Sequence, residues 1–471
     1  MVRILTVKKM NFLDKIKKDY VEVTDLVIKP FGTVTIVYLE TLADQDKIND
    51  YILKILSNNK KITDIKSVIP SPNVKDIKTY EELCLFLESG FTILFNKNTV
   101  IAIETKSDLN RSIDTPSTEA TLYGPKDALV ENYQTNLGLI KRRVKSKRLK
   151  NIVVNVGVYT KTTTSLLYID GLAKKEIVSK TLENLRGIKI DGVTDIGELK
   201  PHLVSDKRNV FPGIKITERP DVIADALLKG KIVVLLDTSP YALILPTFLA
   251  DFINPMSDKY TKPSSVNFIK ILRLFCFFIA IFVPAFYVAV TTINQETIPT
   301  SLLINLQSQR MNVPFPAVME CVITLIICEI LRESDIRFPS SYGSAISILG
   351  ALILGEAAVS AGIVSPIMII VASMTFISSM IFTDTEIIDA LRYWRFIALF
   401  IAAVFGLYGV GLSIILLFIN LSNYEVNGHS YLYPIAPFDK IYLKETLIKL
   451  KNNKRSRILS NNRIKGRLWK D

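Results

Sequence analysis

The distribution of apolar residues along the chain constrains its fold more than any other feature. The first 260 residues are polar and rich in Lys, whereas long apolar stretches begin near residue 265. Over all 471 residues, 49% are apolar and the mean hydropathy is +0.30, so the apolar excess lies in the second half. We therefore predict a soluble half followed by a helical half that is embedded in a membrane.

The apolar half divides into segments that suit membrane helices, for which about 20 residues cross the hydrocarbon core. Leu274–Ile293 and Phe396–Leu421 each predict one crossing, and Ala317–Leu331 is a shorter candidate. Tyr342–Phe382 is long enough for two passes that break around Gly362–Pro366. The chain does not start with a basic segment followed by a short apolar one, so we expect no cleaved signal peptide and a cytoplasmic first half.

The charge of the carboxyl tail conflicts with this count of crossings. Residues 439–471 contain eleven Lys or Arg against three acids, which predicts a cytoplasmic tail by the positive-inside rule. Five full crossings would place the tail on the other side. Re-entry of Ala317–Leu331, or of part of Tyr342–Phe382, is the interpretation that removes the conflict, because irregular backbone is tolerated where it lines protein or water.

The polar half contains a weak internal repeat. TVTIVYLETLAD (33–44) resembles TSLLYIDGLAK (164–174), and each precedes a helical pattern. Residues 80–105 and 219–247 each predict an amphipathic helix, a Gly at its end and two apolar strands. Two α/β lobes of similar plan are therefore expected, with the cleft between them as a default ligand site.

These patterns together predict a two-lobed α/β cytoplasmic domain followed by a polytopic helical transmembrane domain. The expected divisions are a basic amino-terminal segment (1–30), a first lobe (31–115), a second lobe (116–265), a transmembrane domain with four to five segments (266–423) and a basic tail (424–471).

Residues suited to catalysis or metal binding are scarce. The two His residues, His202 and His429, lie far apart, the four Cys residues form no CxxC pair, and no phosphate-binding loop or dinucleotide fingerprint occurs. We therefore expect no enzyme activity, no metal and no cofactor. The basic run KRRVKSKRLK (141–150), expected to continue a helix from Lys126, is read as a solvated face, a subunit contact or a lipid contact, and nucleic acid is not an expected partner.

Five segments carry a family resemblance. They are YGPKDALVENYQTNLGLIKRR (123–143), FPGIKITERPDVIADALLKGKIVVLLDTSP (211–240), VPAFYVAVTTINQETIPTSLL (283–303), VPFPAVMECVITLIICEILRESDIRFP (313–339) and LGALILGEAAVSAGIVSP (349–366). In their motifs and order they resemble the A subunits of spore germinant receptors, the GerA family. One departure is Thr238, which stands where the family usually has Gly.

The resemblance implies a nutrient-responsive complex in the spore inner membrane. It implies assembly with a transporter-like B subunit and a lipoprotein C subunit, contact with membrane lipids, and homo-oligomerisation as a pentamer into a cation-conducting channel. The alternatives are a stage V sporulation AF-type protein that amplifies germination, an ion-coupled secondary transporter, and a scaffold for the B subunit.

Glu356 lies in the run 338–383, which has no other charged side chain. At 100° per residue its helix carries two neighbouring stripes. The small stripe, suited to close helix packing, is Ala351, Gly355, Ala358 and Gly362. The stripe of pore-lining candidates is Leu352, Glu356, Val359 and Ile363. A buried carboxylate is expected to face protein or water, and a symmetric ring of carboxylates would favour cations; a partner within the subunit is the alternative.

Two further groups of charged residues are candidates for structural contacts. In TERPD, Thr217 is expected to cap a helix, and Glu218, Arg219 and Asp221 are candidates for inter-lobe or subunit contacts. The second group is expected to pair at the membrane boundary and consists of Glu320, Glu329, Arg332, Glu333 and Arg337. Because Glu320 and Glu329 lie on nearly opposite helix faces, they are not expected to form one ion site.

Overall fold

The computed structural model describes residues 12–32, 34–58, 73–96, 99–107, 116, 118–119, 123–204, 206, 208–337, 355–440 and 443, with the backbone alone at 335–337. The described residues form two compact units. One is an α/β unit of residues up to 247 without 208–212, and the other is a helical unit of 208–212 and residues from 248 onward. The predicted change from α/β to helical structure is therefore confirmed.

The first lobe, residues 12–107, is a five-stranded antiparallel sheet with the order β1-β2-β4-β5-β3. Its strands are β1 (Leu26–Phe31), β2 (Val34–Leu39), β3 (Val74–Asp76), β4 (Phe91–Phe95) and β5 (Val100–Glu104). Its helices are residues 12–19, α2 (Gln45–Ile48), η1 (Asn49–Leu53), α3 (Lys54–Asn58) and α4 (Tyr80–Leu87). Alternate strand residues face opposite sides, so Val37 packs under α4 while Ile36 packs under α2 and η1.

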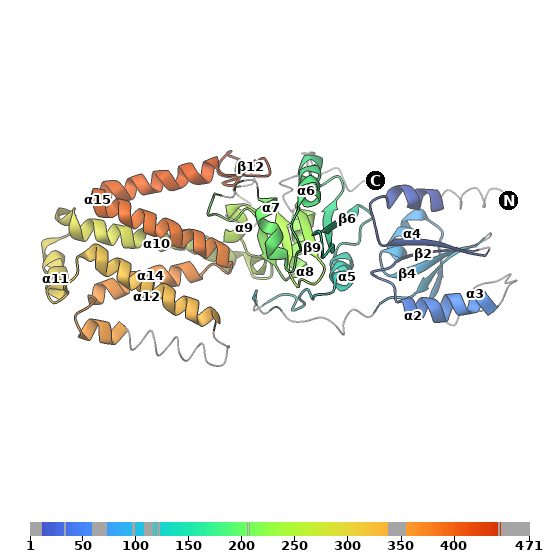
Figure 1. Cartoon of the computed structure of the whole chain (residues 1–471), viewed down its shortest axis with the longest axis horizontal. Helices are drawn as coiled ribbons and strands as arrows, with labels where there is room; N and C mark the ends of the chain where they lie inside the picture. The colour runs from blue at the N-terminus through green and yellow to red at the C-terminus, as the bar shows by residue number, and fades with distance from the viewer. Residues whose placement is uncertain are drawn as a thin grey trace. The chain divides into compact units, whose positions relative to one another are not determined.

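The second lobe, residues 116–247, repeats this arrangement with the order β6-β7-β9-β10-β8. Its strands are β6 (Leu149–Val156), β7 (Thr162–Ile169), β8 (Lys215–Thr217), β9 (Ile232–Leu236) and β10 (Ala242–Leu245). Its helices are α5 (Tyr133–Arg143), α6 (Lys175–Gly187), η3 (Ile196–Leu199), α7 (Lys200–Leu203) and α8 (Pro220–Leu228). Figure 1 shows both sheets with their helices.

The predicted internal repeat is confirmed by this matching strand order. Within it, α4 and α8 occupy equivalent places, as do the hairpins β4–β5 and β9–β10. Gly90 and Gly230 end the two helices with φ values of 83° and 84°, as expected for helix-terminating Gly. A Cβ at Gly90 would lie 2.7 Å from the Leu42 carbonyl oxygen, so both backbone angle and space require Gly there.

The helical unit is built around α10 (Pro263–Thr292), which packs against α14 (Pro366–Met380) and α15 (Thr385–Asn423). The other elements are α9 (Leu249–Ile253), η4 (Met256–Lys259), η5 (Gln295–Thr297), α11 (Thr300–Arg310), α12 (Ala317–Arg337), a short helix at 355–360, β11 (Glu425–Val426) and β12 (His429–Ser430). Among the residues that the structure describes, two helices, α10 and α15, are long and apolar enough to cross a membrane.

Helix α15 is a helical hairpin, which corrects the prediction of one span over Phe396–Leu421. Gly406 in its middle has φ 60° and ψ −141°, outside the helical region. Arg395, before Gly406, donates to the carbonyl of Ala280, while the ring of Phe418, after Gly406, lies tilted against that of Phe278 with 6.4 Å between the centroids. In a straight helix residues 395 and 418 would lie about 34 Å apart, yet both contact the same turn of α10. Figure 1 shows α15 folding back on itself.

Candidate functional site: buried polar residues in the helical unit

A proline in α10 creates the first feature of the site. Pro284 has no backbone N–H, so the carbonyl group of Ala280, four residues earlier, loses its partner within the helix. Arg395 fills this place, because its Nε donates to the Ala280 oxygen at 2.7 Å. Arg395 is only 1% exposed, and it is among the largest fully buried side chains of the described residues.

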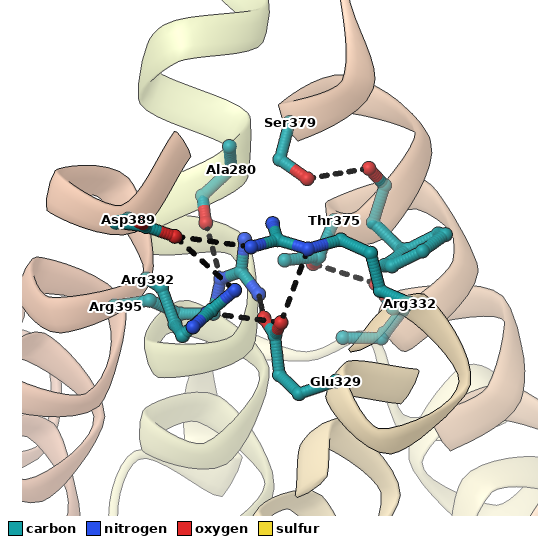
Figure 2. A network of polar contacts seen from close by, with 10 residues as sticks. Ala280, Glu329, Arg332, Thr375, Ser379, Asp389, Arg392 and Arg395 are labelled. Carbon is teal, nitrogen blue, oxygen red and sulfur yellow. Dashed lines mark hydrogen bonds and ion pairs between the residues drawn. The ribbon is translucent and has the colours of Figure 1, made fainter. Parts of the chain in front are cut away.

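Arg395 belongs to a network of three guanidinium groups and two carboxylates, shown in Figure 2. Glu329 on α12 lies 3.3 Å from Arg395, 2.9 Å from Arg392 and 3.6 Å from Arg332. Asp389 lies 3.1 Å from Arg332 and 3.3 Å from Arg392. The network links α10, α12 and α15, and removal of Glu329 would leave the buried charge of Arg395 without its ion-pair partner, a loss of about 3–5 kcal/mol.

Some of the residues predicted to pair at the membrane boundary form ion pairs in the structure. Glu329 and Arg332 contact each other as expected, but both also bind residues of α15. Glu333 is exposed, and the side chain of Arg337 lies outside the described residues.

The members of the network that lie on α15 were not predicted from the sequence. The segment DALRYWRF (389–396) places Asp389, Arg392 and Arg395 three residues apart, which puts them on one helix face. That spacing, in front of an apolar run, was a readable signal. The ion-pair partner of Arg395 could not be predicted from the sequence, because Glu329 lies 66 residues earlier.

Glu320 forms a separate buried site at the other end of α12. Its Oε1 accepts hydrogen bonds from the backbone N–H of Ser365 at 2.7 Å and from the Ser365 hydroxyl at 2.6 Å. Its Oε2 lies 3.4 Å from Nε of Arg310, and the Glu320 side chain is fully buried. Ser365 is the N-cap of α14, so Glu320 anchors the start of that helix. Glu320 and Glu329 serve different sites, in accord with their expected opposite faces.

Asn294 binds the backbone at the tip of the α15 hairpin, the third place in the unit where a helix is interrupted or begins. Its Oδ1 accepts a hydrogen bond from the N–H of Leu407 at 2.9 Å, the first residue after Gly406. A Cβ at Gly406 would lie 2.2 Å from this same oxygen. Three backbone groups thus bind a polar side chain from another element: the free carbonyl of α10, the N–H at the start of α14 and the N–H at the break in α15. Apolar surroundings require such partners.

The short helix at 355–360 carries the residues of the two predicted stripes. Ala351 and Leu352 lie outside the described residues. Ala358 packs against a buried cluster with Met368 and Leu399, and a Cβ at Gly362 would lie 3.0 Å from the Asn312 carbonyl oxygen. Gly362 has φ 66° and ends the helix before α14 begins at Pro366, so the break predicted around Gly362–Pro366 is confirmed.

The other stripe faces outward in the single chain. Glu356 is exposed, Ile363 is 44% exposed, and Val359 is half-buried, whereas Gly355 is half-buried on the side of the small residues. Ala358 and Gly362 of the small stripe thus contact the rest of the subunit, whereas a Cβ at Gly355 would have no neighbour within 4 Å.

The TERPD residues form local contacts within the second lobe. The N-cap of α8 is Arg219, so the prediction of Thr217 as N-cap is wrong; the Thr217 hydroxyl accepts the Arg219 N–H at 3.2 Å instead. Arg219 pairs with Asp221 at 3.0 and 2.7 Å and is 2% exposed. Glu218 accepts hydrogen bonds from the N–H and hydroxyl of Thr118 at 2.7 and 2.8 Å.

The basic run at 141–150 contacts the first lobe. Helix α5 begins at Tyr133, not at Lys126 as expected. Lys141 pairs with Asp25 at 2.5 Å and Lys147 pairs with Asp19 at 2.7 Å. The cavity beside these pairs measures about 10 Å³, room for about one water molecule. The expected ligand site between the lobes therefore has no support from this cavity.

These features define a class of protein: a membrane-associated chain in which a duplicated α/β domain precedes helices with buried ionic networks. The sequence profile described as Bacillus/Clostridium GerA spore germination protein matches residues 14–458. The chain belongs to this GerA family of spore germination proteins, which confirms the resemblance in its sequence motifs.

The chain is similar to several individual proteins, of which spore germination protein KA agrees with this assignment. The chain is 34% identical to spore germination protein KA of Bacillus subtilis (strain 168) over 88% of its own length and 78% of that protein's. It is 33% identical to the uncharacterized membrane protein YfkQ of the same organism, over 88% and 82% of the two chains. The crystal structure of the N-terminal domain of the A subunit of the Bacillus megaterium spore germinant receptor GerK3 is 27% identical, with a TM-score of 0.37, and the match covers 51% of this chain and 95% of that one.

Proposed function

We propose that this chain is the A subunit of a nutrient-responsive germinant receptor and that several copies form a cation-conducting channel in the spore inner membrane. Family membership supports the receptor role and partners of the B and C type. The channel part rests on one observation: the helix at 355–360 packs Ala358 against a buried cluster of the subunit and leaves Glu356 exposed.

An exposed carboxylate in an otherwise uncharged apolar run needs water or a second subunit, because facing lipid costs several kcal/mol. A ring of subunits supplies both, with Ala358 and Gly362 packed inward in each subunit and Glu356 facing a shared lumen. Carboxylate rings favour cations over anions. The proposed topology is multi-pass with six crossings: α10, α12, the two passes predicted over Tyr342–Phe382, the second of which contains α14, and both arms of α15.

Single-channel recording of the assembled complex in planar bilayers tests this function. We expect Glu356→Gln to lower the preference for cations over anions and Glu356→Lys to reverse it, because the lumen would lose or invert its charge. Glu425→Gln is the matched control, since Glu425 is an exposed carboxylate of the same unit outside the proposed lumen.

Three results would count against the channel. Ion selectivity that is unchanged by Glu356→Lys removes Glu356 from the lumen. Saturable solute uptake without conductance assigns the complex to transport instead. Complexes that contain one copy of the chain remove the ring on which the lumen depends.

A further inference from the structure

Residues 19–25 of the first lobe lie along strand β6 of the second lobe, and we call this contact region, together with Glu88 and Lys141, the seam. Val23 forms a parallel bridge with Asn151. The Asn151 N–H donates to the carbonyl of Glu22 at 3.1 Å, and the Thr24 hydroxyl donates to Oδ1 of Asn151 at 2.7 Å. The two lobes are thus joined by backbone and side-chain hydrogen bonds as well as by the ion pairs described above.

Charge is divided between the two sides of the seam. The carboxylates of Asp19 and Asp25 come from the first lobe, and their partners Lys147 and Lys141 come from the second. Lys141 and Asp25 are 7% and 5% exposed, so this pair lies inside the protein. The closed seam therefore places carboxylates of the first lobe against lysines of the second, and Lys150 adds a hydrogen bond to the carbonyl of Asp19.

Glu88 is a further carboxyl group on the acidic side of the seam. It is 8% exposed, accepts a hydrogen bond from the Tyr20 hydroxyl at 2.9 Å and lines the small cavity together with Lys141. Among the described residues it forms no ion pair, although Lys141 faces the same cavity. A carboxyl group buried in this way is most stable when it carries a proton.

The groups around Glu88 act in opposite directions on its pKa. The net effect raises the pKa of Glu88 to about 7; burial is the largest cause of this rise, and the charge of Asp25 also contributes to it. The Tyr20 hydroxyl, Lys141 and Lys147 lower it. Cys84 on α4 also faces this group, and burial raises the pKa of the Cys84 thiol.

We propose that the seam is a proton-controlled latch, in which the buried interface between the lobes accommodates Glu88 while it is protonated and loosens when Glu88 ionises. Ionisation leaves a buried negative charge beside the Asp25–Lys141 pair, where it competes for the same ammonium group. Separation of the lobes hydrates Glu88 and ends this competition. The latch does not depend on the channel proposed above.

The sign of the pH effect follows from the pKa of Glu88 in the two states. The pKa is about 7 in the closed seam and near the ordinary 4.5 once Glu88 is hydrated. The closed seam thus binds the proton more tightly, so its stability is fully present below pH 4.5 and is lost as pH rises through 7. Between pH 5 and pH 8 the opening equilibrium constant should increase on the order of 50-fold.

Hydrogen–deuterium exchange of the full chain in lipid nanodiscs measures this opening at the Asn151 amide, which donates across the seam. After correction for the intrinsic effect of pH, we expect its protection factor to fall about 50-fold from pH 5 to pH 8. The amide of Val234, in the central strand β9, is the internal reference. Glu88→Gln should match the wild type at pH 5 and keep that protection at pH 8.

Two further variants complete the test. Glu81→Gln removes an exposed carboxylate from the same helix and should behave as the wild type. Tyr20→Phe removes a hydrogen bond that lowers the pKa of Glu88, so its opening midpoint should move to higher pH. The latch is disproved by wild-type protection that does not change with pH, by a Glu88→Gln variant that opens as the wild type does, or by a midpoint that Tyr20→Phe leaves in place.

Discussion

At the scale of single residues, Thr238 shows a conflict between side chain and backbone. It follows β9 with φ 74°, a left-handed angle that costs a β-branched residue about 1–2 kcal/mol, and its N–H donates to the Glu131 carbonyl at 2.9 Å. Thr238 is exposed, so its side chain contributes little packing in return. Thr238 occupies the position at which the GerA family usually has Gly.

Thr238→Gly should therefore stabilise the α/β unit by about 1 kcal/mol, the relief of strain less the added freedom of the unfolded chain. Thermal unfolding of the detergent-solubilised chain should show the midpoint of this unit rise by roughly 2–4 °C. Thr238→Ala keeps the Cβ and should gain less. Equal gains from both substitutions would show that the angle is not the source of the strain.

At the scale of elements, the α15 hairpin depends on one glycine. Ala at position 406 would have to adopt φ 60° and ψ −141° and would place its Cβ 2.2 Å from the Asn294 oxygen. We expect Gly406→Ala to destabilise the helical unit by more than about 2 kcal/mol, from backbone strain and loss of the Asn294 cap. Thermal unfolding in detergent measures the loss.

Gly411→Ala is the matched control, because Gly411 lies in the same helix with no neighbouring atom within 4 Å of a Cβ. It should be neutral or stabilising by about 0.5–1 kcal/mol. Asn294→Ala, which removes only the cap, should cost about 1 kcal/mol. A Gly406→Ala chain as stable as the Gly411→Ala chain would refute the strained tip.

The elements also show what the sequence could and could not predict. The two lobes were predictable because strand alternation and the helix-ending Gly90 and Gly230 are local signals. The α15 hairpin was not predictable, because AAVFGLYGVGL (402–412) contains three glycines in an apolar run. The contact that distinguishes Gly406 from the other two comes from Asn294, more than a hundred residues earlier in the sequence. The hydrogen bond from Arg395 to the Ala280 carbonyl oxygen was not predicted for a similar reason. That oxygen lacks a partner within its helix because of Pro284, which lies on α10 and not on the helix of Arg395.

At the scale of the whole chain, the hairpin changes the proposed topology. Tyr424 and Tyr431, after α15, share a cluster with Leu249, which precedes α10, and Leu249 N–H donates to the Tyr431 carbonyl at 3.3 Å. The end of α15 thus lies beside the start of α10. With α15 as two crossings, the basic tail falls on the side from which α10 starts, as the positive-inside rule requires, without re-entry.

Cysteine labelling in sealed, oriented vesicles tests this arrangement. Ser264→Cys at the start of α10 and Asn423→Cys at the end of α15 should react with a membrane-impermeant maleimide from the same side. Gln307→Cys on α11 should react from the opposite side. All three positions are exposed. Labelling of positions 264 and 423 from opposite sides would mean that α15 crosses once.

The cap at the hairpin tip also bears on how the chain is made. Synthesis proceeds from the amino terminus, so α10 and Asn294 leave the ribosome more than a hundred residues before Gly406. The tip, FGLY (405–408), carries no charge that would resist transfer through the bilayer. When it arrives, its free N–H finds an acceptor already in place. The acceptor for the break in α15 is therefore synthesised before the break itself.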